Sequence, residues 1–227
     1  MPTLQLQNHR FRYSSSLSRV VTLAATLGLV LLIVYAPSWQ HVILTLALAG
    51  SALGFAIVLI EKSRVRYTLT DSHFQQHLAK GGWVVKWNNI ERIGLCTHEK
   101  DGWHQPLPWI GIKLKRYEPV LEAICPRIIS DMLLGQRALL YLGAQQSSMV
   151  ARFEDLVLDT SPVKKSNGGY YTGLVAMLAN RMRHQRQFHD FDLFISAQDL
   201  DRDAEDFIGL TRRYLAAAEP SIKSEDS

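Results

Sequence analysis

Two long apolar segments stand near the start of the chain, and an alternation of polar and apolar residues follows them. Residues 20–36 (VVTLAATLGLVLLIVYA) and 41–60 (HVILTLALAGSALGFAIVLI) are separated by a short turn that contains Pro37. A helix rises about 1.5 Å per residue, so about 20 apolar residues cross about 30 Å of hydrocarbon. The second segment has that length, and the first reaches it if the helix starts at Leu17. The pattern predicts a hairpin of two transmembrane helices.

Charged residues are absent from this region and frame it on both sides. From Val20 to Ile60, 41 consecutive residues contain no Asp, Glu, Lys or Arg, and all 21 acidic residues of the chain lie at or after Glu61. The basic residues that frame it are Arg10, Arg12 and Arg19 before it, and Lys62, Arg64 and Arg66 after it. Because basic flanks stay in the cytoplasm, we expect a multi-pass protein of the bacterial inner membrane, with residues 1–19 and the C-terminus both cytoplasmic.

A cleaved signal peptide is the main alternative for the first apolar segment. The apolar part of a signal peptide spans about 7–15 residues and ends at a cleavage site of small residues. Here the first segment is longer, and a second apolar segment follows at once. The hairpin is therefore the preferred interpretation.

Small residues predict where the membrane helices pack closely, because they let two backbones approach each other. They are Ala24 and Gly28 in the first span and Gly50 and Gly54 in the second. Two contacts fit this pattern. We prefer a contact within the hairpin, and the alternative is a homo-oligomer joined through Gly50 and Gly54.

After Arg66 the periodicity changes to the alternation that is typical of strands. The strands that we predict cover residues 66–70, 73–79, 83–87, 90–95 and 108–115. Turns rich in Gly and Asn join the first four, which favours an antiparallel meander. Helical spacing dominates from about 118 to 187, around a strand at 153–158 and a loop at 161–169. A strand at 191–196, a helix at 204–218 and a disordered polar tail at 219–227 follow. The sequence thus predicts an α+β domain over residues 61–218.

Two runs of this domain resemble a known family. YTLTDSHFQQHLAKGGWVVKWNNIERIG (67–94) resembles the opening of a bacterial pleckstrin-homology-like (PH-like) domain, with Trp87, Ile90 and Ile93 as its W-x-x-I-x-x-I element. FDLFISAQDLDRDAEDFIGLTRRYL (191–215) is similar to the last strand and C-terminal helix of that family. Two spans followed by this domain also resemble an uncharacterised family of bacterial inner-membrane proteins. The resemblance implies a PH-like antiparallel sheet with a C-terminal helix, and residues 118–187 are then a helical insertion.

The sequence offers few groups for catalysis or metal binding. His98, Glu99, Asp101 and His104 form the densest ligand-like cluster, but they read as an ordinary polar loop, and zinc-type Cys/His spacing and HExxH are absent. The chain also lacks the G-x-S-x-G and P-loop patterns. The segment 164–169 is a flexible connection or, alternatively, an anion site ahead of a helix. We expect no catalytic residue, cofactor or metal. We expect Cys96 and Cys125 to be reduced thiols packed as small apolar groups, and the alternative is one disulfide between them.

Basic residues give one candidate binding surface. Residues 61–227 carry 22 basic and 21 acidic residues, so the pI of about 9.1 reflects the membrane flanks and does not indicate nucleic-acid binding. Near an anionic leaflet each Lys or Arg contributes about 1 kcal/mol. The candidate lipid contacts are Lys62, Arg64, Arg66, Arg181, Arg183 and Arg186. For Arg181, Arg183 and Arg186 we prefer a second interpretation, in which they lie on a helix face exposed to water.

These patterns favour a non-enzymatic role. We expect a membrane-anchored cytoplasmic module that contacts the bilayer and binds a partner protein or anionic lipid headgroups. One alternative is an oligomeric membrane scaffold assembled through the hairpin. The other is an enzyme acting on a membrane-linked substrate with residues of the 98–104 or 161–169 loop, which requires a deep pocket with converging polar groups.

Overall fold

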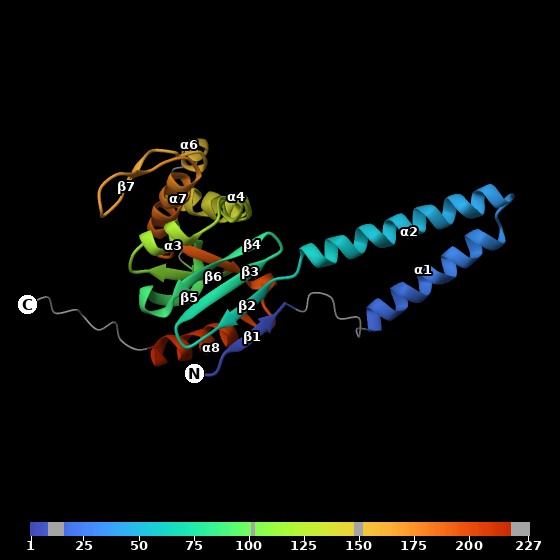
Figure 1. The fold of residues 1–227 in the computed structure, drawn as a ribbon, viewed down its shortest axis with the longest axis horizontal. Coiled ribbons are helices and arrows are strands. Elements are labelled where there is room, and N and C mark those ends of the chain that lie inside the picture. Colours follow the sequence, from blue (N-terminus) through green and yellow to red (C-terminus); the bar gives the residue numbers. More distant parts are fainter. Residues whose placement is uncertain (9–15, 101–102, 148–151, 219–227) are drawn as a thin grey trace, which may run out of the picture. The chain divides into compact units, whose positions relative to one another are not determined.

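The computed structural model describes residues 1–8, 16–100, 103–147 and 152–218. The chain divides into two compact units (Figure 1). Residues 9–64 form the helical unit, and residues 1–8 together with 65–227 form the α+β unit. The tail predicted at 219–227 lies outside the described residues.

The helical unit contains two apolar helices, as the sequence predicts. They are α1 (Ser16–Val34) and α2 (Trp39–Lys62). The second is long and apolar enough to cross a membrane, with a mean hydropathy of 2.5 over 18 residues, and α1 contains a shorter apolar stretch. Large apolar side chains of both helices are exposed, for example 69% of Leu23 and 66% of Phe55. Exposed apolar surface of this extent marks a contact with lipid or with another protein.

The first sheet of the α+β unit contains a strand that the sequence analysis missed. Its antiparallel order is β1 (Leu4–Gln7), β2 (Arg66–Leu69), β3 (His73–Leu78) and β4 (Gly81–Lys86). The first strand comes from the segment 1–19, which we expected only to supply basic charge. Leu4 pairs with Leu69 and Gln7 with Arg66. The alternation of LQLQ puts Leu6, 6% exposed, on the core side and the two glutamines on the outer side.

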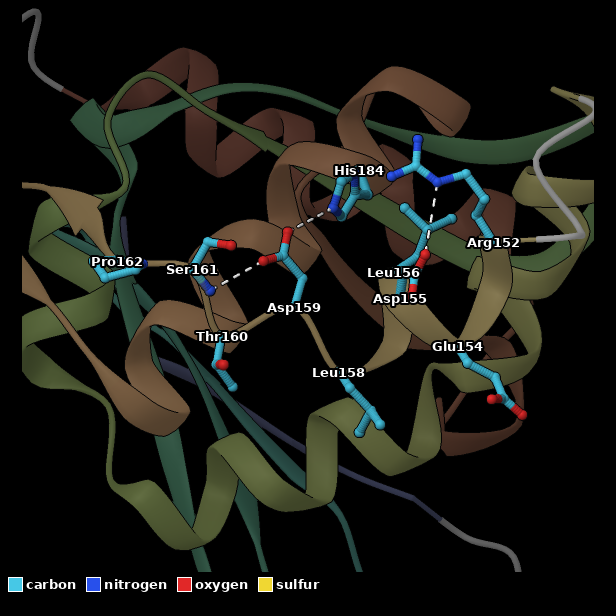
Figure 2. A pocket seen from close by; sticks show the side chains of 10 residues that line it. All are labelled: Arg152, Glu154, Asp155, Leu156, Leu158, Asp159, Thr160, Ser161, Pro162 and His184. Atoms are coloured by element: carbon cyan, nitrogen blue, oxygen red, sulfur yellow. Dashed lines mark hydrogen bonds and ion pairs between the residues drawn. The ribbon is translucent and has the colours of Figure 1, made fainter.

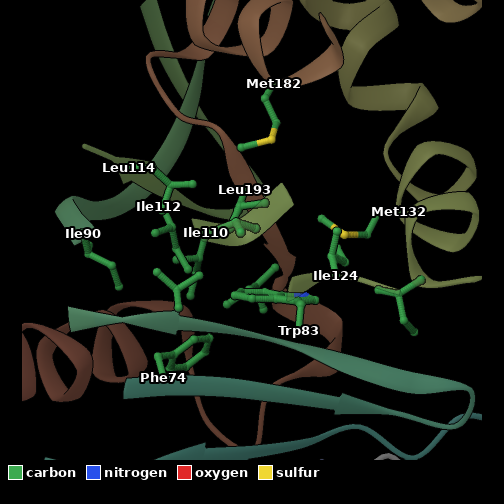
Figure 3. Packing of buried hydrophobic residues seen from close by; sticks show 14 of the residues in the cluster. Phe74, Trp83, Ile90, Ile110, Ile112, Leu114, Ile124, Met132, Met182 and Leu193 are labelled. Carbon is green, nitrogen blue, oxygen red and sulfur yellow. The ribbon is translucent and has the colours of Figure 1, made fainter. Parts of the chain in front are cut away.

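The second sheet consists of β5 (Ile90–Lys100), β6 (Trp103–Leu114) and β9 (Leu193–Ser196) in the antiparallel order β5-β6-β9. A 3₁₀ turn at Trp87–Asn89 joins it to β4, and another at Ala197–Asp199 follows β9. Figure 3 shows the core between the two sheets, where Phe74 and Trp83 of the first sheet face Ile110 and Leu193 of the second.

The final helix closes this core. α8 (Ala204–Ala217) buries Phe207, whose ring centroid lies 5.3 Å from that of Tyr67 and 6.3 Å from that of Phe74. The Tyr214 hydroxyl also donates to the carbonyl oxygen of Pro2 over 2.7 Å. The helix therefore ties the N-terminal strand to the end of the domain.

A mainly helical segment connects β6 to β9, as expected for residues 118–187. Its elements are α3 (Glu118–Ala123), α4 (Pro126–Gly135), α5 (Arg137–Gln146), α6 (Phe153–Val157), β7 (Val163–Lys164), β8 (Tyr170–Tyr171) and α7 (Gly173–His189). The strand predicted at 153–158 is wrong, because Phe153 starts a helix and packs edge-on against Tyr141. The loop predicted at 161–169 is partly wrong too, since β7 and β8 pair across it.

Candidate functional site

The three arginines of α7 differ in exposure, and Arg181 is buried. Arg181 is 2% exposed and donates to the carbonyl oxygens of Leu133 (3.3 Å) and Val157 (3.2 Å). These carbonyls end α4 and α6, where the helix dipoles concentrate negative charge. Burial, and then the charge of Arg137, lower the pKa of Arg181 to about 10. The expected lipid contact at Arg181 is therefore wrong: the side chain caps two helices inside the domain.

Arg186 is half-buried and has a carboxylate partner. Its Nε donates to Oδ1 of Asp192 over 2.7 Å, and its Nη2 donates to Oδ2 of the same residue. The fully buried Asp192 side chain also accepts from the Leu114 backbone N–H (2.7 Å) and the Tyr117 hydroxyl (2.8 Å). A carboxylate with this many donors is a structural anchor. Arg183 remains exposed, so only one of the three arginines is available to a surface ligand.

The basic residues after α2 differ from one another as well. Arg64 lies 3.1 Å from the carboxylate of Glu61, one turn back along the chain. Lys62 is exposed at the end of α2. Arg66 is exposed on β2, and within the described part of the chain it makes no ion pair. Arg66 is thus the cation of this group that is most available.

Arg66 belongs to a hollow on the outer face of the first sheet, which we name the polar trough. The trough has a volume of about 460 Å³ and is lined by Gln5, Leu6, Gln7, Arg66, Tyr67, Thr68 and His77. Thr68 Oγ1 lies 3.1 Å from His77 Nε2. None of the four strands of this sheet contains Asp or Glu. The trough therefore offers amide, hydroxyl, imidazole and guanidinium groups without a competing carboxylate.

A second hollow, of about 680 Å³, lies beside α6 and α7 (Figure 2). In it His184 Nε2 lies 3.2 Å from Asp159 Oδ2, and the Ser161 N–H donates to Asp159 Oδ1 over 3.0 Å. Asn180 Nδ2 donates to the same Oδ1 and to the Ser161 carbonyl oxygen. Burial alone raises the pKa of Asp159, but the hydrogen bonds from Ser161 and His184 outweigh it and hold that pKa below its usual value.

This second hollow does not have the geometry of a nucleophilic triad. A triad places the imidazole between the carboxylate and the hydroxyl. Here Asp159 stands between Ser161 and His184 and binds both. The arrangement braces the turn that precedes β7, and Thr160 and Pro162 of that turn line the open hollow. The enzyme alternative at the 161–169 loop stays a prediction.

The remaining sequence candidates form no metal or anion site within the described residues. Asp101 lies outside the described residues, as do the side chains of Glu99 and His104. Among the described residues no group of three His, Cys, Asp or Glu side chains is placed to hold a metal ion. The segment 164–169 does not open α7, because β8 and Thr172 intervene, so it offers no helix N-terminus to an anion.

The two cysteines are free, as expected, but they differ in exposure. Cys96 is buried in the second sheet, and burial raises the pKa of its thiol to about 12. Cys125 is exposed just before α4. The expectation that both pack as small apolar groups is therefore correct for Cys96 and wrong for Cys125.

The small residues of the helical unit do not hold the two helices together. In the part of the chain that the structure describes, a Cβ atom built on Gly28, Gly50 or Gly54 meets no heavy atom within 4 Å. Ala24 is exposed on α1. The preferred contact within the hairpin is therefore wrong for the three glycines, and their contact with a second copy stays a prediction.

Comparison with known families gives one match. The family described as "Protein of unknown function (DUF2982)" matches residues 67–217. The chain belongs to this family. The matched range starts inside β2 and ends with α8, so it contains neither β1 nor the helical unit. No curated protein and no solved structure matches the chain. The expected membership of an uncharacterised family is thus confirmed, and the matched part of this DUF2982 protein is residues 67–217 of the α+β unit.

Proposed function

We propose that this DUF2982 protein is a membrane-anchored binding module of the bacterial inner membrane. The helical unit crosses the membrane twice, and the α+β unit on the cytoplasmic side binds anionic lipid headgroups or a partner protein. The proposal rests on the connection between the two units, on the fold of the α+β unit and on the charges that flank the apolar helices.

The observation that carries the proposal is that the helical unit interrupts a sheet. Residues 9–64 leave the α+β unit after Asn8 and return to it at Val65, and the Asn8 N–H donates to the Val65 carbonyl oxygen over 3.0 Å. Two paired strands must lie on the same side of a membrane. The pairing of β1 with β2 therefore supports an even number of crossings between Asn8 and Val65.

The proposal assigns the two crossings to α1 and α2, of which α2 is long and apolar enough to span a membrane. The 19 residues of α1 and the 24 residues of α2 correspond to about 28 and 36 Å of helix. Arg19 and Lys62 stand at the outer ends of the pair, and the turn between the helices has no charge. The positive-inside rule then places the α+β unit in the cytoplasm.

The strand topology supports the PH-like interpretation and with it a binding role. A four-stranded sheet packs against a three-stranded sheet, and α8 covers the core between them. β1 supplies a seventh strand that the sequence analysis lacked. The two additions to this plan are the helical unit between β1 and β2 and the segment between β6 and β9. A fold alone does not define a ligand, so the binding surface has to be argued from its residues.

Assembly into a scaffold is a second candidate, favoured by the open surface at Gly50 and Gly54. Small residues that are not used within the hairpin leave a face of α2 on which another apolar helix can pack closely. Such assembly is compatible with a binding role of the α+β unit.

Thiol labelling tests the topology. Cys125 is an exposed natural thiol on the α+β unit, and Ser38→Cys adds one in the turn between α1 and α2. With a membrane-impermeant maleimide on intact spheroplasts, we expect labelling at position 38 and labelling of Cys125 only after permeabilisation. A Cys125→Ser variant assigns the signals. Labelling of Cys125 in intact spheroplasts, or release of the chain by alkali, contradicts the proposal.

A further inference from the structure

We propose that the polar trough binds the phosphate of an acidic glycerophospholipid headgroup, with Arg66 as its main contact. This inference rests on the proposed function, because it requires the trough to lie on the cytoplasmic side of the membrane. It names the ligand class and the binding residues of the module.

The sheet register brings the polar groups of the trough together in two rows. In the first row, Gln7 of β1 pairs with Arg66 of β2, and Arg66 pairs with His77 of β3. Gln7 and Arg66 are close in sequence to the two ends of the helical unit. In the second row, Gln5 pairs with Thr68. These residues are two positions from Gln7 and Arg66 along their strands, so they lie on the same outer face of the sheet. Neighbouring strands lie about 4.8 Å apart, so these groups lie side by side along the trough of about 460 Å³.

The charge of the trough fits an anion with one phosphate. The guanidinium of Arg66 presents a planar fork of N–H donors that matches two phosphate oxygens. Within the described residues no carboxylate pairs with it, and the four strands contain no acidic residue. The amides of Gln5 and Gln7 and the hydroxyl of Thr68 provide further partners for phosphate oxygens and for the hydroxyl groups of a glycerol headgroup.

The connection to α2 makes a lipid the favoured source of that phosphate. Three residues separate Arg66 from Lys62, the last residue of α2. An extended chain spans at most about 3.6 Å per residue, so Arg66 stays within about 14 Å of the end of a membrane-crossing helix. Headgroups are held at high effective concentration at that distance, and a weak contact suffices for occupancy. Free phosphate has no such advantage.

Lipid retention by the full chain tests the proposal. The protein is purified in a non-ionic detergent and mixed with equal amounts of phosphatidylglycerol and phosphatidylcholine, and the bound lipids are counted by native mass spectrometry. We expect the wild type to prefer phosphatidylglycerol and Arg66→Gln to lose about one bound phosphatidylglycerol per chain. The preference should fall roughly five-fold, which corresponds to one basic contact with an anionic lipid. Arg183→Gln removes an exposed arginine outside the trough and should have no effect.

A second variant separates binding from folding. Gln7→Glu places a carboxylate opposite Arg66 across β1 and β2, where a cross-strand ion pair supports the sheet. We expect it to keep the unfolding midpoint and to lose phosphatidylglycerol in the same way as Arg66→Gln. Wild-type lipid retention by both variants overturns the proposal, and so does displacement of phosphatidylglycerol by excess inorganic phosphate. Alkaline extraction on the same samples reports separately on membrane anchoring: release of the wild-type chain sinks the proposed function itself.

Discussion

The backbone N–H of Asn8 donates to the carbonyl oxygen of Val65 over 3.0 Å, although residues 9–64 lie between them. This hydrogen bond continues the ladder between β1 and β2 to the point where the helical unit begins and ends. The N-terminal residues are therefore part of the domain that follows the apolar helices. In sequence, the helical unit is therefore an insertion between two paired strands of one sheet.

The first prediction concerns the strand β1. Leu6 is 6% exposed and faces the core, so Leu6→Ala should lower the free energy of unfolding by about 2–3 kcal/mol. Gln5→Ala, on the exposed side of the same strand, should change it by about 0.5 kcal/mol or less. Urea denaturation of the full chain in detergent, followed by tryptophan fluorescence, measures both. Equal effects of the two variants would show that β1 does not hold the sheet.

The second prediction compares two arginines of α7. Arg181→Glu replaces the cation that caps α4 and α6 with a buried anion, and it should destabilise the domain by about 3–5 kcal/mol. Arg183→Glu changes an exposed side chain and should cost about 0.5 kcal/mol or less. The same urea denaturation experiment measures the free energy of unfolding of both variants. If Arg181→Glu left the free energy of unfolding unchanged, the burial of Arg181 would be contradicted, and Arg181 would again be a candidate lipid contact.

These two cases show what the sequence predicts and what it does not. The spacing of apolar residues is sufficient to predict a helix or strand that buries one of its faces. Phe74 and Trp83 on the meander and Phe207 on α8 are examples. β1 has only four residues, and its partner strand lies far along the chain, so LQLQ alone does not distinguish a strand from a polar tail.

The candidate site was harder to predict for a related reason. The charge of Arg181 suggested that its side chain lies on the surface. The side chain is buried instead, because backbone carbonyls at the ends of two other helices accept its hydrogen bonds. The local sequence does not reveal these acceptors. Arg66 was among the sequence candidates, but Gln5 and Gln7 were not. Their role depends on the pairing of β1 with β2, which no local pattern reveals. A short alternating segment ahead of the apolar helices was the only available signal.

The third prediction concerns the reactivity of the two thiols. Burial raises the pKa of Cys96 to about 12, so almost none of its thiolate is present at neutral pH, whereas Cys125 is exposed. Maleimide should add one label to the native chain and two labels to the chain in denaturant. Intact-protein mass spectrometry counts the labels, and Cys125→Ser should bring the native count to zero. Two labels on the native chain would contradict the burial of Cys96.

The fourth prediction concerns acid sensitivity. His189 is buried, with Nε2 3.1 Å from the Leu139 carbonyl oxygen, and burial holds its pKa below the ordinary value, with His98 acting in the same direction. The unfolded chain then binds a proton more readily than the folded one, so stability is complete above about pH 6.5 and falls as the pH drops below it. The carboxylates of Asp159 and Asp190 have lowered pKa values and lose their contribution only at lower pH.

His189→Gln separates this contribution from the others. The neutral amide does not titrate, so the unfolding midpoint of the variant should change less than that of the wild type between about pH 5 and 7. The midpoints are compared by urea denaturation at several pH values. Parallel profiles of the two proteins would exclude His189 as the group responsible.

The last prediction concerns the face of α2 that carries Gly50 and Gly54. Among the described residues, no heavy atom lies within 4 Å of a Cβ atom built on either glycine, so we expect leucine at both positions to leave the hairpin intact and to obstruct only a neighbour that packs there. If the chain assembles through this face, Gly50→Leu with Gly54→Leu should shift the detergent-solubilised protein to a smaller species in light scattering coupled to gel filtration. Ala52→Leu with Ala56→Leu alters the opposite side of the helix at the same spacing and should leave the mass unchanged. An unchanged mass for both double variants would remove the glycines as an assembly surface.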